Sequence, residues 1–145
     1  MAEKQPSMAH QVARIASALQ FKRTGHTPKS VTVVLSKDTM VITMHGALSP
    51  AEQAAAASPE GAAKVQEYHR QLYATSACKL RKELKRITGV DVREAAAEIE
   101  TKTGTVVHAF TSGAMVQVFL MADDIATETW SGDPARDTPL PVETA

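Results

Sequence analysis

The sequence predicts an α+β fold in which an antiparallel sheet packs on a long helix. Apolar residues recur every three or four positions over residues 7–23 and again over a long segment that ends near residue 88. Between these segments, residues 31–35 and 40–45 are rich in β-branched side chains and show period-two alternation. With further β-rich segments after residue 90, the expected order is α-β-β-α-α-β-β with an additional C-terminal strand.

The first helix is expected over residues 7–23. Ser7 can serve as its N-cap, while Gly25 and Pro28 mark its end, because glycine accepts the left-handed conformation there and proline cannot continue the hydrogen-bond ladder. The side chains that set its period are Met8, Val12, Ile15, Ala16 and Leu19.

The next two segments, residues 31–35 and 40–45, are expected to form a hairpin. Four residues, Ser36-Lys37-Asp38-Thr39, separate them and supply the turn. Alternation places one set of apolar side chains on the same sheet face: Val31, Val33, Leu35, Met40, Ile42 and Met44.

A capping box predicts the next helix. Ser49-Pro50-Ala51-Glu52 combines a capping hydroxyl, a first-turn proline and a carboxylate three residues after the serine. Ser58-Pro59-Glu60 interrupts this short helix and starts a long one, which continues to about Thr88 and ends at Gly89.

The long helix is expected to extend past the sheet. A helix of some 28 residues spans about 40 Å, whereas strands of five or six residues span about 17 to 20 Å. A second copy of the chain is the simplest cover for the part that extends, so we expect a symmetric homodimer with the long helices at or near the interface.

The segment after Gly89 has mixed signals. Residues 90–100 contain both strand formers and an alanine- and glutamate-rich stretch that favours helix, and we expect a strand there. Further strands are expected at 106–110, after a turn at 101–104, and at 115–121. Residues 1–122 are therefore expected to form one domain. Residues 123–145, which are acidic and contain three prolines, are expected to form a disordered tail.

Composition excludes some functions and localisations. The 16 basic and 16 acidic residues balance, which argues against a strongly cationic nucleic-acid binder. One cysteine fits a reducing compartment, and the chain shows no signal peptide or membrane-span pattern, so we expect a cytoplasmic protein. No cofactor or metal site is expected, because the five histidines form none of the paired metal-binding motifs.

Positive charge is concentrated on the long helix, in a group that we call the basic face. A cationic ridge can contact phosphate, anionic lipid or an acidic partner, but a solvated helix surface is the simpler interpretation. The acidic segment after residue 122 is a candidate to dock on it. The members of the basic face are Lys79, Arg81, Lys82, Lys85 and Arg86.

Several stretches, in order, resemble the MpsC-like family of small bacterial proteins, formerly a domain of unknown function. They are Gly25-x-x-Pro28-Lys29, residues 46–52, residues 61–70, Leu84-x-x-Ile87-Thr88-Gly89-Val90-x-Val92, Glu98-Ile99-x-Thr101-Lys102-Thr103-Gly104 and Phe110-Thr111. The resemblance implies a strand at 90–100. Two departures are Glu98, where the family usually has Asp, and the added residues 115–145, which are expected to extend the sheet, cover an interface or alter a partner.

The family resembles the soluble component of a sodium-translocating, membrane-potential-generating system associated with inorganic-carbon uptake. This implies a non-enzymatic accessory or regulatory protein that binds a partner, with a membrane transport system as the candidate. One alternative is a small-molecule or anion sensor in which Lys29, Arg70 and Lys102 contribute to a pocket at the dimer interface. A second alternative is nucleic-acid binding through the basic face. No catalytic residues are expected, because nucleophile and phosphate-loop motifs are missing.

Overall fold

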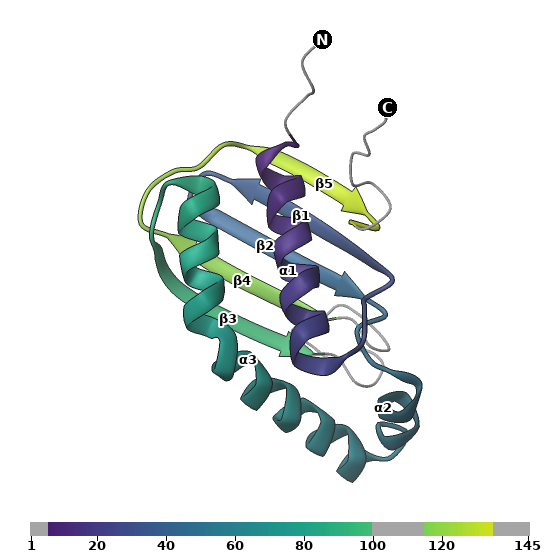
Figure 1. The fold of residues 1–145 in the computed structure, drawn as a ribbon. Helices are drawn as coiled ribbons and strands as arrows, with labels where there is room; N and C mark the ends of the chain where they lie inside the picture. Colours follow the sequence, from purple (N-terminus) through teal and green to yellow (C-terminus); the bar gives the residue numbers. More distant parts are fainter. Residues whose placement is uncertain (1–5, 100–114, 135–145) are drawn as a thin grey trace.

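The computed structural model describes residues 6–99 and 115–134 of the chain. Within them, five antiparallel strands form one sheet in the order β3-β4-β2-β1-β5 (Figure 1). The predicted α+β class is confirmed, whereas the strand expected at 106–110 lies outside the described residues. The helices are α1 (Met8–Thr24), α2 (Pro50–Ala55) and α3 (Pro59–Thr88), and the strands are β1 (Ser30–Ser36), β2 (Thr39–His45), β3 (Val92–Ile99), β4 (Met115–Met121) and β5 (Glu128–Gly132).

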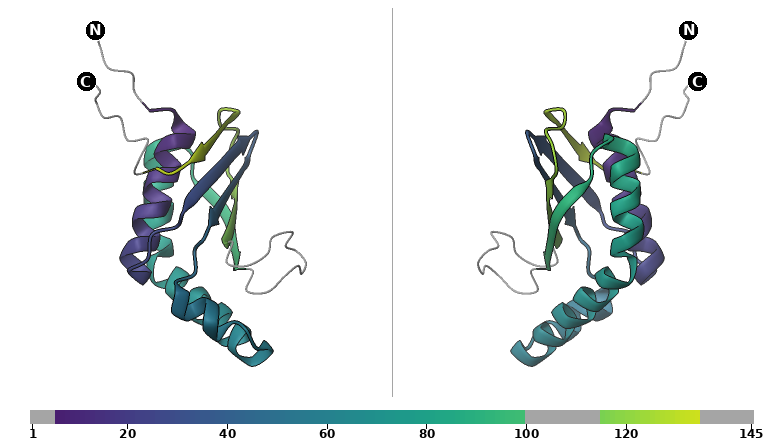
Figure 2. Two further views of the ribbon diagram at one scale, coloured as in Figure 1. Left: turned by 90° about the vertical axis from the view of Figure 1, so that its right-hand side faces the viewer. Right: turned by 90° about the vertical axis from the view of Figure 1, so that its left-hand side faces the viewer.

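Both long helices lie on the same face of the sheet (Figure 2). α1 packs over β1 and β5, and the C-terminal half of α3 packs over β3. The predicted apolar face of the β1–β2 hairpin points into this layer, where all six of its side chains are fully buried. β4 adds Phe119 and two methionines to the same core, so the interior lies between one sheet face and two helices.

Local signals at the helix ends have the predicted roles. The Ser7 hydroxyl accepts a hydrogen bond from the His10 amide at 3.1 Å, which caps α1. α1 and α3 each end at a glycine in the left-handed conformation, Gly25 with φ 75° and Gly89 with φ 79°. Both halves of the capping box between Ser49 and Glu52 are formed at the start of α2. These contacts satisfy backbone groups that each helix end would otherwise leave unpaired.

α3 extends beyond the sheet and changes direction as it does so (Figure 2). The Thr75 hydroxyl donates to the Leu72 carbonyl at 2.7 Å, a type of side-chain contact that is associated with helix bending. α2 packs beside the extended half of α3, and we call residues 50–75 the arm. Three side chains of α3 are buried in the arm: Ala62, Val65 and His69. α2 therefore covers part of the overhang for which a second copy was expected, and the homodimer stays a prediction.

β5 corrects the prediction of a disordered tail for residues 123–134, whereas residues 135–145 lie outside the described part of the chain. β5 lies within residues 123–145 and pairs with β1, with Trp130 opposite Val33. Its order comes from contacts with α1: the Trp130 ring stacks on His10 with centroids 4.4 Å apart, and Glu128 Oε1 accepts a hydrogen bond from the Ala9 amide at 2.8 Å. Glu128 of the acidic segment thus contacts the N-terminus of α1, where the helix dipole favours negative charge, and not the basic face.

β4 also has a more central position than an added segment would suggest. It pairs with β2 on one side and with β3 on the other, so it joins the two parts of the sheet. β3 is a strand, as expected for residues 90–100, and the helix alternative for that segment is wrong.

Candidate functional site

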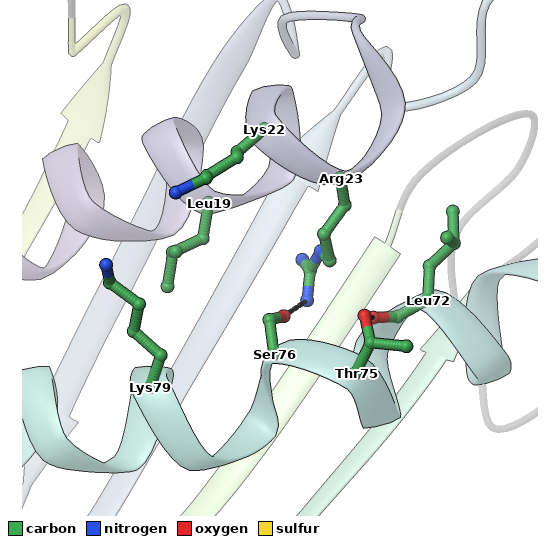
Figure 3. A pocket seen from close by; sticks show the side chains of 7 residues that line it. All are labelled: Leu19, Lys22, Arg23, Leu72, Thr75, Ser76 and Lys79. Carbon is green, nitrogen blue, oxygen red and sulfur yellow. Dashed lines mark hydrogen bonds between the residues drawn. The ribbon is translucent and has the colours of Figure 1, made fainter.

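A pocket of about 410 Å³ lies between the last turns of α1 and the middle of α3 (Figure 3). We call it the cationic pocket, because three of its seven lining side chains carry positive charge and none carries negative charge. Two leucines supply its apolar surface and two hydroxyl side chains complete it. The lining residues are Leu19, Lys22, Arg23, Leu72, Thr75, Ser76 and Lys79.

Arg23 is held in place by three neighbours. Its Nη1 donates to Ser76 Oγ at 2.8 Å, and its Nη2 donates to Gln20 Oε1 at 2.6 Å. The guanidinium carbon also lies 5.6 Å from the centre of the Tyr73 ring, within the range of a cation–π contact. Burial lowers the pKa of Arg23, although the interaction with Tyr73 opposes this shift. An arginine stays charged despite such a shift, so Arg23 brings an oriented positive charge to the pocket.

Tyr73 lies beside this arginine on α3. Burial raises the pKa of its hydroxyl, and the charges of Arg81 and Arg23 oppose the change. Tyr73 is therefore neutral at neutral pH and contributes its ring, not a charge, to the surroundings of Arg23.

Lys22 and Lys79 approach the pocket from opposite helices. Figure 3 shows their amino groups on the same side of the pocket, with Leu19 pointing from α1 toward α3. Within residues 6–99 and 115–134, neither amino group takes part in an ion pair. The two lysines therefore leave hydrogen-bond donors available at the pocket.

The basic face predicted on α3 is partly neutralised. Lys85 Nζ lies 3.1 Å from the Asp91 carboxylate, and Arg86 Nη2 lies 2.7 Å from that of Glu83. Exposed pairs of this kind stabilise a protein little, but they reduce the field that a phosphate backbone would meet.

The other three members of the basic face have different surroundings. Arg81 donates to the Val92 carbonyl at 3.4 Å. Lys79 lines the cationic pocket, whereas Lys82 is exposed and is not among the residues that line it. The five residues therefore do not act as one uniform cationic ridge.

Two of the residues proposed for a dimer-interface pocket, Lys29 and Arg70, lie in separate parts of the fold. Lys29 precedes β1, where its amide donates to the His45 carbonyl at 2.8 Å and its side chain packs against Gly46. Arg70 lies on the exposed side of α3, and its Nη1 is 3.2 Å from Glu67 Oε1. Lys102 lies outside the described residues. A pocket that combines them stays a prediction.

The predicted site residues did not include Lys22, Arg23 or Ser76. Lys22 and Arg23 read as ordinary basic residues at a helix C-terminus, where they complement the dipole. Arg23 and Ser76 are 53 residues apart, so only the packing of α1 on α3 brings them together. The two adjacent cations in the last turn of α1 are the one feature of the sequence that could have indicated this pocket.

A second polar contact holds the arm. His69 is 2% exposed, and its Nε2 lies 2.7 Å from Glu52 Oε2. The other carboxylate oxygen of Glu52 accepts a hydrogen bond from the Ser49 amide at 2.9 Å. Burial alone would raise the pKa of Glu52, but the hydrogen bonds from Ser49 and His69 and the interaction with His69 together lower it. The ionised carboxylate therefore accepts a hydrogen bond from each of these neighbours at neutral pH.

The geometry defines a small two-layer α+β protein with a cationic pocket between its long helices. Within the described part of the chain, no group of three or more His, Cys, Asp or Glu residues could hold a metal ion. Among the helices of residues 6–99, none has both the length and the apolar character needed to cross a membrane.

Comparison with protein families identifies the group to which this fold belongs. A family model described as "Na+-translocating membrane potential-generating system (MpsC)" matches residues 4–113, and the chain belongs to this family. Comparisons with curated proteins and with solved structures give no match. The family match ends before β4, so the strand that joins the two parts of the sheet lies beyond the matched residues.

Proposed function

We propose that this protein is a non-enzymatic accessory or regulatory subunit that binds the membrane component of a sodium-translocating, membrane-potential-generating system. The observation that carries the proposal is family membership over residues 4–113. We place the protein at the cytoplasmic face of the membrane, in line with its single cysteine.

The arm is the surface that we propose for partner contact. It extends away from the sheet, and it exposes half of the Tyr68 side chain. Tyrosine supplies a large apolar area and a polar tip, and it is enriched where proteins bind one another. Phe21, on α1, is 53% exposed and provides a matched aromatic control away from the arm.

The test measures sodium-dependent membrane potential in cells that lack the protein and are complemented with variants. We expect the wild type and Phe21→Ser to restore the potential and Tyr68→Ser to restore less of it. Affinity capture from solubilised native membranes should recover the same membrane protein with the wild type and Phe21→Ser, and less with Tyr68→Ser. No effect of the deletion on the potential, together with no captured membrane protein, would overturn the proposal.

Two companion measurements address the remaining expectations. Sedimentation at micromolar concentration should show the mass of a dimer, and a monomeric mass would contradict the homodimer. A gel-shift titration at low salt tests nucleic-acid binding, which the local pairing of Lys85 and Arg86 disfavours.

A further inference from the structure

We propose that the cationic pocket binds a small organic anion in which a divalent oxyanion group, such as a phosphate monoester, is attached to a short apolar part. The inference does not depend on the proposed function, because it follows from the side chains that line the pocket. The volume of about 410 Å³ lies in the range of small-molecule sites.

The charge of the lining favours a divalent anion. Lys22, Arg23 and Lys79 bring three positive charges, and the lining contains no carboxylate to offset them. An anion bound in this pocket is attracted by all three charges. A monovalent anion would neutralise one of the three charges, whereas a phosphate monoester neutralises about two of them at neutral pH.

Helix-end electrostatics do not account for this grouping. Lys22 and Arg23 lie in the last turn of α1, where cations complement the helix dipole. Lys79 lies nine residues before the end of α3, beyond the last turn in which that effect operates. Its position opposite Lys22 is therefore not a helix-end effect, and it suits a ligand shared by the two lysines.

The donors are oriented for an oxyanion. Arg23 is positioned by Ser76, Gln20 and Tyr73, so its remaining N–H groups have a defined direction. The two lysines provide mobile donors on the same side of the pocket (Figure 3). Arginine with lysine is a common combination around phosphate groups, since one gives directional and the other adaptable charge.

The apolar surface of the pocket predicts the rest of the ligand. Leu19 comes from α1 and Leu72 from α3, so each helix contributes apolar surface to the pocket. Burying such a group adds affinity that inorganic phosphate cannot obtain. We therefore expect an organic anion to bind more tightly than the free oxyanion.

Isothermal titration calorimetry of the full chain with phenyl phosphate tests the inference. The titrations are run at a fixed ionic strength of about 0.15 M, so that general screening is the same for each ligand. Inorganic phosphate and phenol serve as the charge-only and ring-only probes. We expect phenyl phosphate to bind most tightly, inorganic phosphate more weakly and phenol not at all.

Lys79→Gln is the diagnostic variant, and Lys82→Gln is its matched control on the same helix. Loss of one charge-assisted contact should weaken phenyl phosphate binding about tenfold in Lys79→Gln, with no change in Lys82→Gln. Both lysines are exposed, so circular dichroism should confirm that both variants fold. Equal weakening by the two variants, equal affinity for phosphate and phenyl phosphate, or no binding to the wild type would each overturn the proposal.

Discussion

Replacing Glu52 by Gln should loosen the arm while leaving the sheet unchanged. None of the six residues of α2 is buried, so this helix depends strongly on its polar contacts. Glu52 makes two of them, because one oxygen accepts from the Ser49 amide and the other from His69. Glutamine has nearly the same shape and still suits a capping box, so the substitution mainly removes the charge.

The expected loss follows from the type of hydrogen bond. A bond to a charged group contributes about 1.5 to 3 kcal/mol, and a neutral bond about 0.5 to 1.5 kcal/mol. The Glu52 side chain is 18% exposed, so solvent weakens its hydrogen bonds in part. We therefore expect the charged bond to exceed the neutral one by about 1 kcal/mol, near the lower limit of the difference between these ranges. A local opening free energy that falls by this amount raises the open population about fivefold.

Hydrogen exchange of the α2 amides measures this population directly. We expect exchange about fivefold faster in Glu52→Gln, with the β1, β2 and β4 amides unchanged. Glu67→Gln is the matched control, since it removes a carboxylate from an exposed pair with Arg70 on the same arm and should change exchange little. Equal α2 exchange in the two variants would refute the role given to the Glu52–His69 contact.

Three further predictions concern stability. The pKa of Glu52 is lowered on folding, so its contribution is present above the ordinary carboxyl pKa and is lost as pH falls through the lowered value. The difference in denaturant stability between the wild type and Glu52→Gln should thus be present at about pH 7 and shrink as the pH falls below the ordinary carboxyl range; a constant difference would contradict this. Phe119→Ala should lower the unfolding free energy by about 3 to 5 kcal/mol in urea titration, because the ring is fully buried on β4, an interior strand; a loss below about 1 kcal/mol would contradict that packing. Gln117 is 1% exposed, and neither of its amide atoms has a hydrogen-bond partner among the described residues. Gln117→Met should therefore increase the unfolding free energy by about 1 to 2 kcal/mol and raise the thermal midpoint. A lower midpoint would show that the amide has a structural role.

The elements that could be predicted from the sequence are those with local causes. The α2 capping box is contained in four consecutive residues, and the left-handed glycines after α1 and α3 mark ends that a regular period had already indicated. The β1–β2 hairpin likewise follows from alternation and a short turn. Each of these signals acts over a few residues, where composition and spacing determine the outcome.

β5 and the cationic pocket could not be predicted because their causes are distant in sequence. Trp130 orders β5 by stacking on His10, and Arg23 reaches Ser76 only because α1 packs on α3. Acidic composition suggested disorder around Trp130, and nothing near it in sequence indicated a partner strand. The tertiary contacts outweigh that local composition, as they often do in strands at the edge of a sheet.

The interior position of β4 in the sheet has a consequence for synthesis of the chain. α1 and the β1–β2 hairpin leave the ribosome before β4, and β4, which pairs with the other edge of β2, is complete only at Met121. Until then one edge of β2 is unpaired in the nascent protein, and methionines that are buried after folding are exposed beside it. An unpaired strand edge is a template for wrong strand pairing. Pairing of this edge therefore depends on translation through Met121, and conditions that slow elongation between β2 and β4 should favour aggregation over folding.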